Sequence, residues 1–257
     1  MTSARATGIE KWHGRPARES ESHGQDARAT TSWLLGLLQA GDSFYPTGSY
    51  AHSFGLEALV QEGVVRDRTT LRQFIFQSTL PALRHVELPL AAHAWRAFAT
   101  PDWPRLGELC VLSSALKTAR EARLASENIG RQRAELMATL RANPLAQEFL
   151  RRVAAKNWPH SAAVSAALEG RVLGAPLPAV LAGISYAALS SLLSAAMKIL
   201  RLGQNAAQSL LTEALNATPE IIAAAETTPL EEIGWFNPWL DIAAARHESA
   251  DARMFIS

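Results

Sequence analysis

The sequence predicts an all-α protein, a single compact bundle of roughly eight to ten helices. Apolar residues recur at spacings of three and four along most of the chain, which is the period of an amphipathic helix. No stretch combines sustained apolar and polar alternation with enrichment in Val and Ile, the pattern typical of strands. Because 48% of the 257 residues are hydrophobic, the chain is also apolar enough to bury a sizeable core.

The first thirty residues differ in composition from the rest. They are rich in Gly, Arg, Ser and Thr and show almost no apolar periodicity, so they cannot bury a core. We expect residues 1–30 to form a disordered, low-complexity extension and residues 31–257 to form one all-helical domain. The extension lacks the apolar central run of a signal peptide, and its acidic residues argue against an organellar transit peptide.

The helical pattern of the domain can be followed in order along the chain. TSWLLGLLQAGDSF predicts a short apolar helix closed by a Gly-Asp pair. Residues 69–99 keep the helical period, and Pro81 and Pro89 predict breaks or bends within it. Residues 105–140 mix Ala, Leu, Glu and Arg, which are all good helix formers, so a further helical region is expected there.

The stretch from Val172 to Met197 contains no charged residue and is long enough to span a bilayer. Two prolines near its start and many small residues make it less hydrophobic than a Leu-rich membrane helix. We therefore favour a buried helix at the hub of the bundle over a transmembrane helix, and expect no membrane partner.

Charge and cysteine content exclude several classes of protein. The formal net charge of +1 leaves no strongly basic stripe of the kind that binds nucleic acid, so no nucleic-acid partner is expected. The single cysteine, Cys110, excludes an internal disulfide framework and fits a reducing compartment, so we expect a cytoplasmic protein.

A search for catalytic motifs finds none. The sequence lacks a phosphate-binding loop, a dinucleotide fingerprint, a Gly-x-Ser-x-Gly elbow and a His-Glu-x-x-His pair. The seven histidines do not pair at helical spacing, so no metal-ligating set is predicted. Cys110 lies in the apolar stretch ELCVLSSAL, and we interpret it as a small buried hydrophobe rather than a nucleophile. The prediction is no catalytic residue, no metal site and no cofactor.

Polar and aromatic residues gather instead in four clusters: FYPTGSYAHSFGLEALV at 44–60, KTAREARLASENIGRQ at 117–132, LRLGQNAAQSLL at 200–211 and DIAAARHESADARMFIS at 241–257. In order and spacing these clusters resemble the signatures of the urease accessory protein UreF family. The matching elements are a Pro-x-Gly turn leading into Gly-Leu-Glu, a Glu-x-Arg-x-x-Ser helix, a Leu-Gly-Gln motif and an Arg-His-Glu ending in Arg-x-Phe-x-Ser. The resemblance covers residues 32–257.

The resemblance implies a non-catalytic scaffold that forms a homodimer through its own helices. Such a scaffold binds the accessory protein UreD (also called UreH) and recruits the GTPase UreG. The assembly delivers nickel to apo-urease and couples this delivery to GTP hydrolysis. The absence of a phosphate-binding loop then fits, because the nucleotide chemistry would belong to UreG and this chain would regulate it. The alternatives are a stand-alone helical enzyme or a metal carrier, either of which would use His52, Glu57 and Cys110.

The opening cluster supplies the first site candidates. Pro46 and Gly48 predict a turn that Pro pre-sets and Gly permits. Gly55 is costly inside a helix unless another group must approach closely there. The partner-binding candidates of this cluster are Tyr50, His52 and Glu57. For the histidine, a packed structural role and a role facing a partner or the nickel path both stay open. For the glutamate, a carboxylate facing a partner or a metal route stands against a capping or salt-bridge role.

The second cluster and the uncharged helix add further candidates. Glu121 and Arg123 would ordinarily belong to a solvated, charged helix face. The resemblance implies instead that both, together with Ser126, help to order the core near the opening turn. Glu121 and Arg123 are also partner-binding candidates. Tyr186 lies in the middle of the uncharged stretch and is a candidate dimer contact.

The last two clusters predict a helix end and a docking tail. Gly203 is expected to end the long apolar helix, with the Gln204 amide satisfying exposed backbone groups. Apolar residues at the extreme end of a chain suggest docking. We favour a tail that folds onto the UreD-type partner over one that docks on its own bundle. The partner-binding candidates of the tail are Arg246, His247, Glu248, Arg253 and Phe255.

Overall fold

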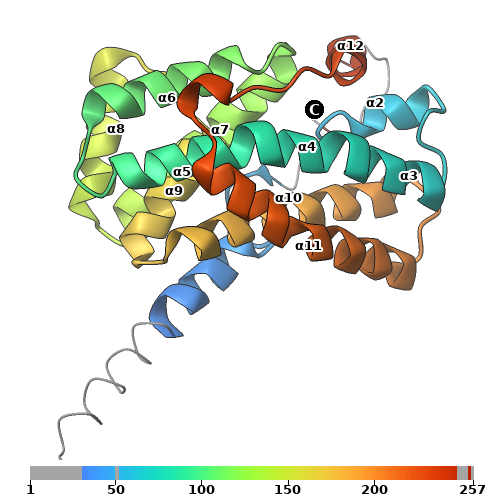
Figure 1. Cartoon of the computed structure of the whole chain (residues 1–257), viewed down its shortest axis with the longest axis horizontal. Helices are drawn as coiled ribbons and strands as arrows, with labels where there is room; N and C mark the ends of the chain where they lie inside the picture. Colours follow the sequence, from blue (N-terminus) through green and yellow to red (C-terminus); the bar gives the residue numbers. More distant parts are fainter. Residues whose placement is uncertain (1–30, 50–51, 248–253, 256–257) are drawn as a thin grey trace, which may run out of the picture.

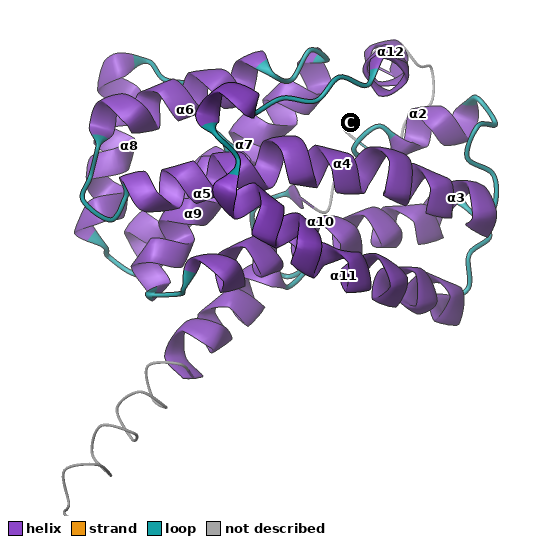
Figure 2. Ribbon diagram, viewed as in Figure 1, coloured by secondary structure: helices purple, strands orange, loops and turns teal. Residues whose placement is uncertain are grey.

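The computed structural model describes residues 31–49, 52–247, 254 and 255. The expectations for residues 1–30 and for Tyr50, Glu248 and Arg253 lie outside the described residues, as does the side chain of His247. Within the described part, the chain is all-α and contains no strand, which confirms the predicted fold class (Figure 2). Counting the continuous rod described below as one helix, these residues form ten helices.

Most of the helices follow one another with short connections, whereas residues 228–237, which contain the 3₁₀ turn Leu230–Glu232, form a longer one before α12 (Figure 1). They are residues 31–41, α2 (Leu56–Gln61), α3 (Arg68–Phe74), α4 (Leu80–Ala82), α5 (Leu88–Ala97), α6 (Trp103–Ala115), α7 (Arg120–Leu140), α8 (Pro144–Lys156), α9 (Ala162–Leu173), α10 (Leu177–Ile199), α11 (Gln204–Thr227) and α12 (Pro238–His247).

Side chains of the expected types mark the helix ends. Asp102, Asn143 and Ser161 cap α6, α8 and α9, because their side-chain oxygens accept hydrogen bonds from backbone N–H groups of the first helical turn. At the other end, Asn157 and Gly174 follow α8 and α9 in the left-handed conformation that ends many helices. Local sequence therefore sets these boundaries.

The hub of the bundle is α9, not the long uncharged helix that the sequence favours for this place. Every residue of α9 from Ala163 to Gly170 is buried, and the helix packs against α5, α6, α7, α8 and α10. Small side chains allow this close packing: a Cβ on Gly170 would lie 2.3 Å from Val180 Cγ2.

The uncharged stretch is divided between two helices. Gly174 ends α9, and α10 begins only at Leu177. By length and composition α10 could cross a membrane. In the structure, however, it packs along α11, α5 and α9 and leaves a strip of residues around Tyr186 exposed. The expectation of a helix within the bundle is therefore confirmed, but α10 is only partly buried and is not the hub.

The helices α3, α4 and α5 form one continuous rod, joined by two π-helical turns at Ile75–Thr79 and Leu83–Glu87. Each π-helical turn comes just before a proline, Pro81 in the first case and Pro89 in the second. A wider turn makes room for a ring that would otherwise meet the preceding helical turn. The helix is therefore not broken at either proline.

The second proline has a consequence outside the rod. Pro89 has no N–H, so the carbonyl of His85, four residues earlier, loses its usual helical donor. This carbonyl accepts a hydrogen bond from the backbone N–H of Gly234 at 3.0 Å. The side-chain amide of Asn237 also donates to Ser78 Oγ of the rod at 3.1 Å. The rod thus anchors the segment that leads from α11 into α12.

The expected role of Gly203 as a helix terminator is wrong. The helix α10 ends at Ile199, and Gly203 is the residue that precedes α11, with φ of −73°. Gln204 is the first residue of α11, and its side chain is exposed. The chain leaves the helical conformation at Leu200, which is extended, so no left-handed glycine is needed there.

Candidate functional site

The opening segment forms the predicted turn. Gly48 has φ of 75°, in the left-handed region that favours glycine, and Pro46 lies exposed beside it. Gly55 is not inside a helix, as the sequence suggested, but is the N-cap residue of α2, with φ of 82°. A Cβ on Gly55 would lie 2.7 Å from Cδ1 of Leu240 in α12, so the close approach expected at this glycine is confirmed.

A buried polar group lies beneath the turn. The Tyr45 hydroxyl donates to Glu169 Oε1 at 2.6 Å, and the guanidinium of Arg133 pairs with the other oxygen of the same carboxylate. Burial, together with the Glu169 charge, raises the pKa of Tyr45, so its hydroxyl stays protonated. Sequence reasoning missed this group, although Glu169 is the one acidic residue of the mostly apolar α9.

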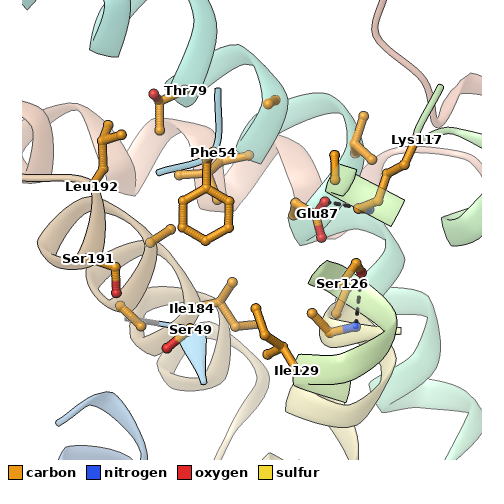
Figure 3. A pocket seen from close by; sticks show the side chains of 18 of the residues that line it. Ser49, Phe54, Thr79, Glu87, Lys117, Ser126, Ile129, Ile184, Ser191 and Leu192 are labelled. Atoms are coloured by element: carbon orange, nitrogen blue, oxygen red, sulfur yellow. Dashed lines mark hydrogen bonds and ion pairs between the residues drawn. The ribbon is translucent and has the colours of Figure 1, made fainter. Parts of the chain in front are cut away.

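A cavity of about 340 Å³ lies between the rod, α7 and α10 (Figure 3). Apolar side chains such as Ile129, Ile184 and Leu192 form most of its wall. Ser49, Phe54 and Gly55 line it as well, and the ring of Phe54 points into it (Figure 3). Further lining residues come from the segment that leads into α12 and from α12 itself, namely Trp235, Asn237, Leu240, Asp241 and Ala244. Phe54 has φ of 53°, an uncommon value for a bulky residue, so its position is imposed by the surrounding structure.

Polar residues of the second cluster lie at the other side of this cavity. Lys117 Nζ pairs with Glu87 Oε1 of the rod at 2.8 Å, and Arg123 donates to the Lys117 carbonyl at 2.9 Å. Ser126 is buried, and its hydroxyl accepts a hydrogen bond from the N–H of Ala162 at 3.3 Å. Arg123 and Ser126 thus make contacts within the bundle, and the expectation that they order the core near the opening turn stays a prediction.

The charge of Glu121, in the second cluster, acts on His52 in the first cluster. Glu121 lines the cavity, and His52 is buried below the opening turn. Burial lowers the pKa of His52, and the negative charge of Glu121 opposes part of that shift. His52 is therefore neutral near pH 7, as a packed structural histidine would be.

Glu57 contacts the other end of the chain. It is buried in α2, and its Oε1 and Oε2 accept hydrogen bonds from the backbone N–H groups of Met254 at 2.8 Å and Phe255 at 3.0 Å. The ring of Phe255 is buried, with Lys198 Nζ 5.4 Å from its centroid. In this structure the described part of the tail thus docks on its own bundle. Folding of the tail onto a partner stays a prediction.

The remaining candidates do not join this site. Arg246 of α12 pairs with Glu62 at the end of α2 at 3.2 Å, on the surface. Tyr186 is 45% exposed on α10, beside Gly41 of the first helix. Cys110 is fully buried, and burial raises the pKa of its thiol to about 12, so the nucleophilic thiolate is scarce at neutral pH. Across the described residues, no group of three or more His, Cys, Asp or Glu could hold a metal ion.

Known proteins are similar to this chain in sequence over most of its length. A family model described as UreF matches residues 65–215. The urease accessory protein UreF of Bacillus sp. (strain TB-90) is 31% identical over 225 residues, which cover 87% of this chain and 99% of the relative. The urease accessory protein UreF of Arthrobacter sp. (strain FB24) is 29% identical over 229 residues, covering 89% and 99%. The urease accessory protein UreF 1 of Brucella melitensis biotype 1 is 30% identical over 227 residues, covering 87% and 92%.

Proposed function

This chain belongs to the UreF family of urease accessory proteins, and on that premise we propose that it is a non-catalytic scaffold for nickel insertion into apo-urease. In this role it binds a UreD-type accessory protein, recruits the GTPase UreG and regulates its GTP hydrolysis in the cytoplasm. Nickel is the cargo of the assembly rather than a resident cofactor of this chain.

The observation that carries this proposal is the meeting of the first and last clusters. Glu57 and Phe255 are almost 200 positions apart in the sequence, yet the carboxylate of one holds the backbone of the other. A carboxylate that already accepts two backbone hydrogen bonds is poorly placed for proton transfer. Together with the inert thiol of Cys110, this favours a surface for protein partners over the alternative of an enzyme built on His52, Glu57 and Cys110.

Reconstitution tests the proposal. Apo-urease, nickel and GTP are combined with UreD and UreG, with or without this chain, and urease activity is measured. We expect full activation only when this chain is present, and no GTP hydrolysis by the chain alone. Equal activation without the chain, or GTP hydrolysis by the chain alone, would contradict the scaffold role.

Deletion of residues 245–257 tests the tail. The deletion removes Arg246 and Phe255, so we expect loss of UreD pulldown, with the helical circular dichroism and the dimer mass unchanged. Unaltered pulldown would refute the assignment of the tail to this partner.

Glu57→Ala should lower urease activation without unfolding the chain, and an unchanged activation and metal content of urease would make this residue purely structural.

For the homodimer, we propose that a second copy packs on the exposed strip around Tyr186. Leu34, Leu35 and Leu38 are exposed on the neighbouring helix at residues 31–41, which contacts α10 at Gly41 and Tyr186. These leucines enlarge the apolar surface beside the tyrosine. Tyr186→Asp should halve the mass measured by light scattering. Val111→Asp, at an exposed apolar residue of α6, is the matched control and should leave the mass unchanged.

A further inference from the structure

The cavity between the rod, α7 and α10 is large enough for a small organic molecule. Its volume of about 340 Å³ is within the range of about 300–1,000 Å³ that is usual for small-molecule sites. It is also about twice the ~150 Å³ cavity that takes up one benzene molecule. Small residues of α10 leave this space, among them Gly183, Ala187 and Ala188. A ligand of about 12–17 non-hydrogen atoms would fill it.

The rod borders the cavity where it departs from the α-helix. Thr79 of the first π-helical turn lines the wall, as do Leu83, Val86 and Glu87 of the second. A π-helical turn inside an α-helix frequently lies at a functional site. Both irregular turns of the rod thus contribute side chains to this cavity.

Four charged residues of the wall are already paired with one another. Glu87 Oε1 lies 2.8 Å from Lys117 Nζ, and the carboxylate of Glu169 pairs with the guanidinium of Arg133 (Figure 3 shows the first pair). A charged ligand that drew on any of these groups would have to break an ion pair that is shielded from water. The pairs therefore do not favour a charged ligand.

The other charged residues of the described wall are acidic, namely Glu121 and Asp241. Both would repel an anion such as a fatty acid. A cation would exchange its hydration for a wall that is mostly apolar, which is unfavourable. Nor do the described residues offer a group of three or more His, Cys, Asp or Glu for a metal ion. The wall therefore fits an uncharged ligand best.

Two hydroxyl groups can orient such a ligand. Thr79 of the rod and Ser191 of α10 line the cavity (Figure 3), and the structure shows no hydrogen bond from either hydroxyl to the described residues. A hydroxyl both donates and accepts hydrogen bonds, so it can bind a carbonyl or hydroxyl group of a ligand. The ring of Phe54, which points into the cavity, adds an aromatic face.

We propose that this cavity binds an uncharged, mostly apolar small molecule that carries a carbonyl or hydroxyl group. Such a ligand contacts the rod, α7, α10 and Leu240 of α12 at the same time, so its binding stabilises the folded chain. The site goes beyond the proposed function. It needs neither UreD nor UreG, so it can fail while the scaffold role holds, and the reverse.

Two fluorescent probes test the charge and the apolar character of the ligand. N-phenyl-1-naphthylamine is uncharged, and anilinonaphthalene sulfonate has the same aromatic skeleton with an added negative charge. We expect the full chain to bind the uncharged probe saturably, with one probe molecule per chain, and to gain thermal stability from it. The charged probe should bind on the order of tenfold more weakly or worse, because the cavity lacks a free cation for it among the described wall residues.

Substitutions that fill the cavity test its location. Ala188→Phe places a ring in the space beside α10, and Ser191→Leu is a smaller second filling variant. Each should weaken binding of the uncharged probe, Ala188→Phe on the order of tenfold or more. The matched control is Ala223→Phe, at an exposed position of α11 outside the wall, which should leave binding unchanged. Circular dichroism checks that each variant is folded.

Amide hydrogen exchange of the unmodified chain locates the probe without any substitution. The uncharged probe should slow exchange in peptides that cover residues 79–87 and 184–192. Absence of saturable binding would overturn the proposal. So would protection confined to exposed apolar residues such as Leu34 and Leu35, or equal binding by both filling variants and the control. Equally tight binding of the charged probe would overturn the assignment of an uncharged ligand.

Discussion

Glu169→Ala removes the carboxylate that joins Tyr45 and Arg133 inside the bundle. The side chains of Glu169 and Arg133 are 3% and 13% exposed, so the pair is almost fully shielded from water. Loss of the carboxylate leaves the guanidinium of Arg133 without its counter-charge and the Tyr45 hydroxyl without its acceptor. Removal of one partner from a buried ion pair costs about 3–5 kcal/mol of unfolding free energy.

Thermal unfolding followed by circular dichroism measures this loss. For a domain of this size each kcal/mol corresponds to about 2–4 °C in Tm, so Glu169→Ala should lower Tm by roughly 6–20 °C. The control is Glu213→Ala, which removes the surface pair between Arg72 of α3 and Glu213 of α11. Because that pair is solvated and screened, its loss should lower Tm far less than Glu169→Ala does.

A double substitution tests the reason as well as the size of the effect. Glu169→Met combined with Arg133→Leu replaces both charged side chains with apolar ones and leaves no buried charge unpaired. The double variant should therefore be more stable than Glu169→Ala alone. If Glu169→Ala unfolds within a few degrees of the Glu213→Ala control, Glu169 is not compensating a buried charge and the reasoning is refuted.

Three other predictions concern single sites. Because burial raises the pKa of Tyr45, the unfolded chain loses this proton first, near pH 10, so stability should fall as pH rises above about 10. Tyr45→Phe should flatten that part of the stability curve in denaturant titrations; an unchanged slope would exclude this cause. Iodoacetamide should label Cys110 far more slowly in the folded chain than in urea, as read by mass spectrometry, since its thiol is buried with a pKa of about 12. Gly130→Ala should cost about 1–3 kcal/mol, because the new Cβ would lie 2.5 Å from the backbone of Ser161. Gly203→Ala, which meets nothing within 4 Å, should change stability by less than about 0.5 kcal/mol, and equal effects of both would contradict the packing of α7 on α9.

The fold was largely predictable because helices leave a local record in the sequence. The spacing of apolar residues indicated the all-α class, and capping residues such as Ser161 marked helix starts. The spacing does not say which apolar helix lies innermost, since that depends on packing between distant segments. The small residues of α9, among them Gly170, allow this helix to lie innermost. The longer and more hydrophobic α10 keeps one face exposed.

The site was predictable only in part, for the same physical reason. The turn at Pro46 and Gly48 follows from local backbone preferences, and the structure confirms it. The pairing of Glu57 with the tail, and of Tyr45 with Glu169, joins residues more than 120 positions apart. No local pattern records such pairs, because each depends on how the helices between them pack.

The prolines of the rod bear on which insertions and deletions the chain can accept. A π-helical turn holds one residue more than the α-helical turn it replaces. Loss of one residue from Leu83–Glu87 would restore plain α-helix without rotating either flank, whereas the same loss in α9 would turn all that follows by about 100°. Pro89 would then clash with the carbonyl four residues before it, so a viable deletion must also replace the proline. Such a chain would reclaim the His85 carbonyl for the helix and would leave Gly234 to find another acceptor.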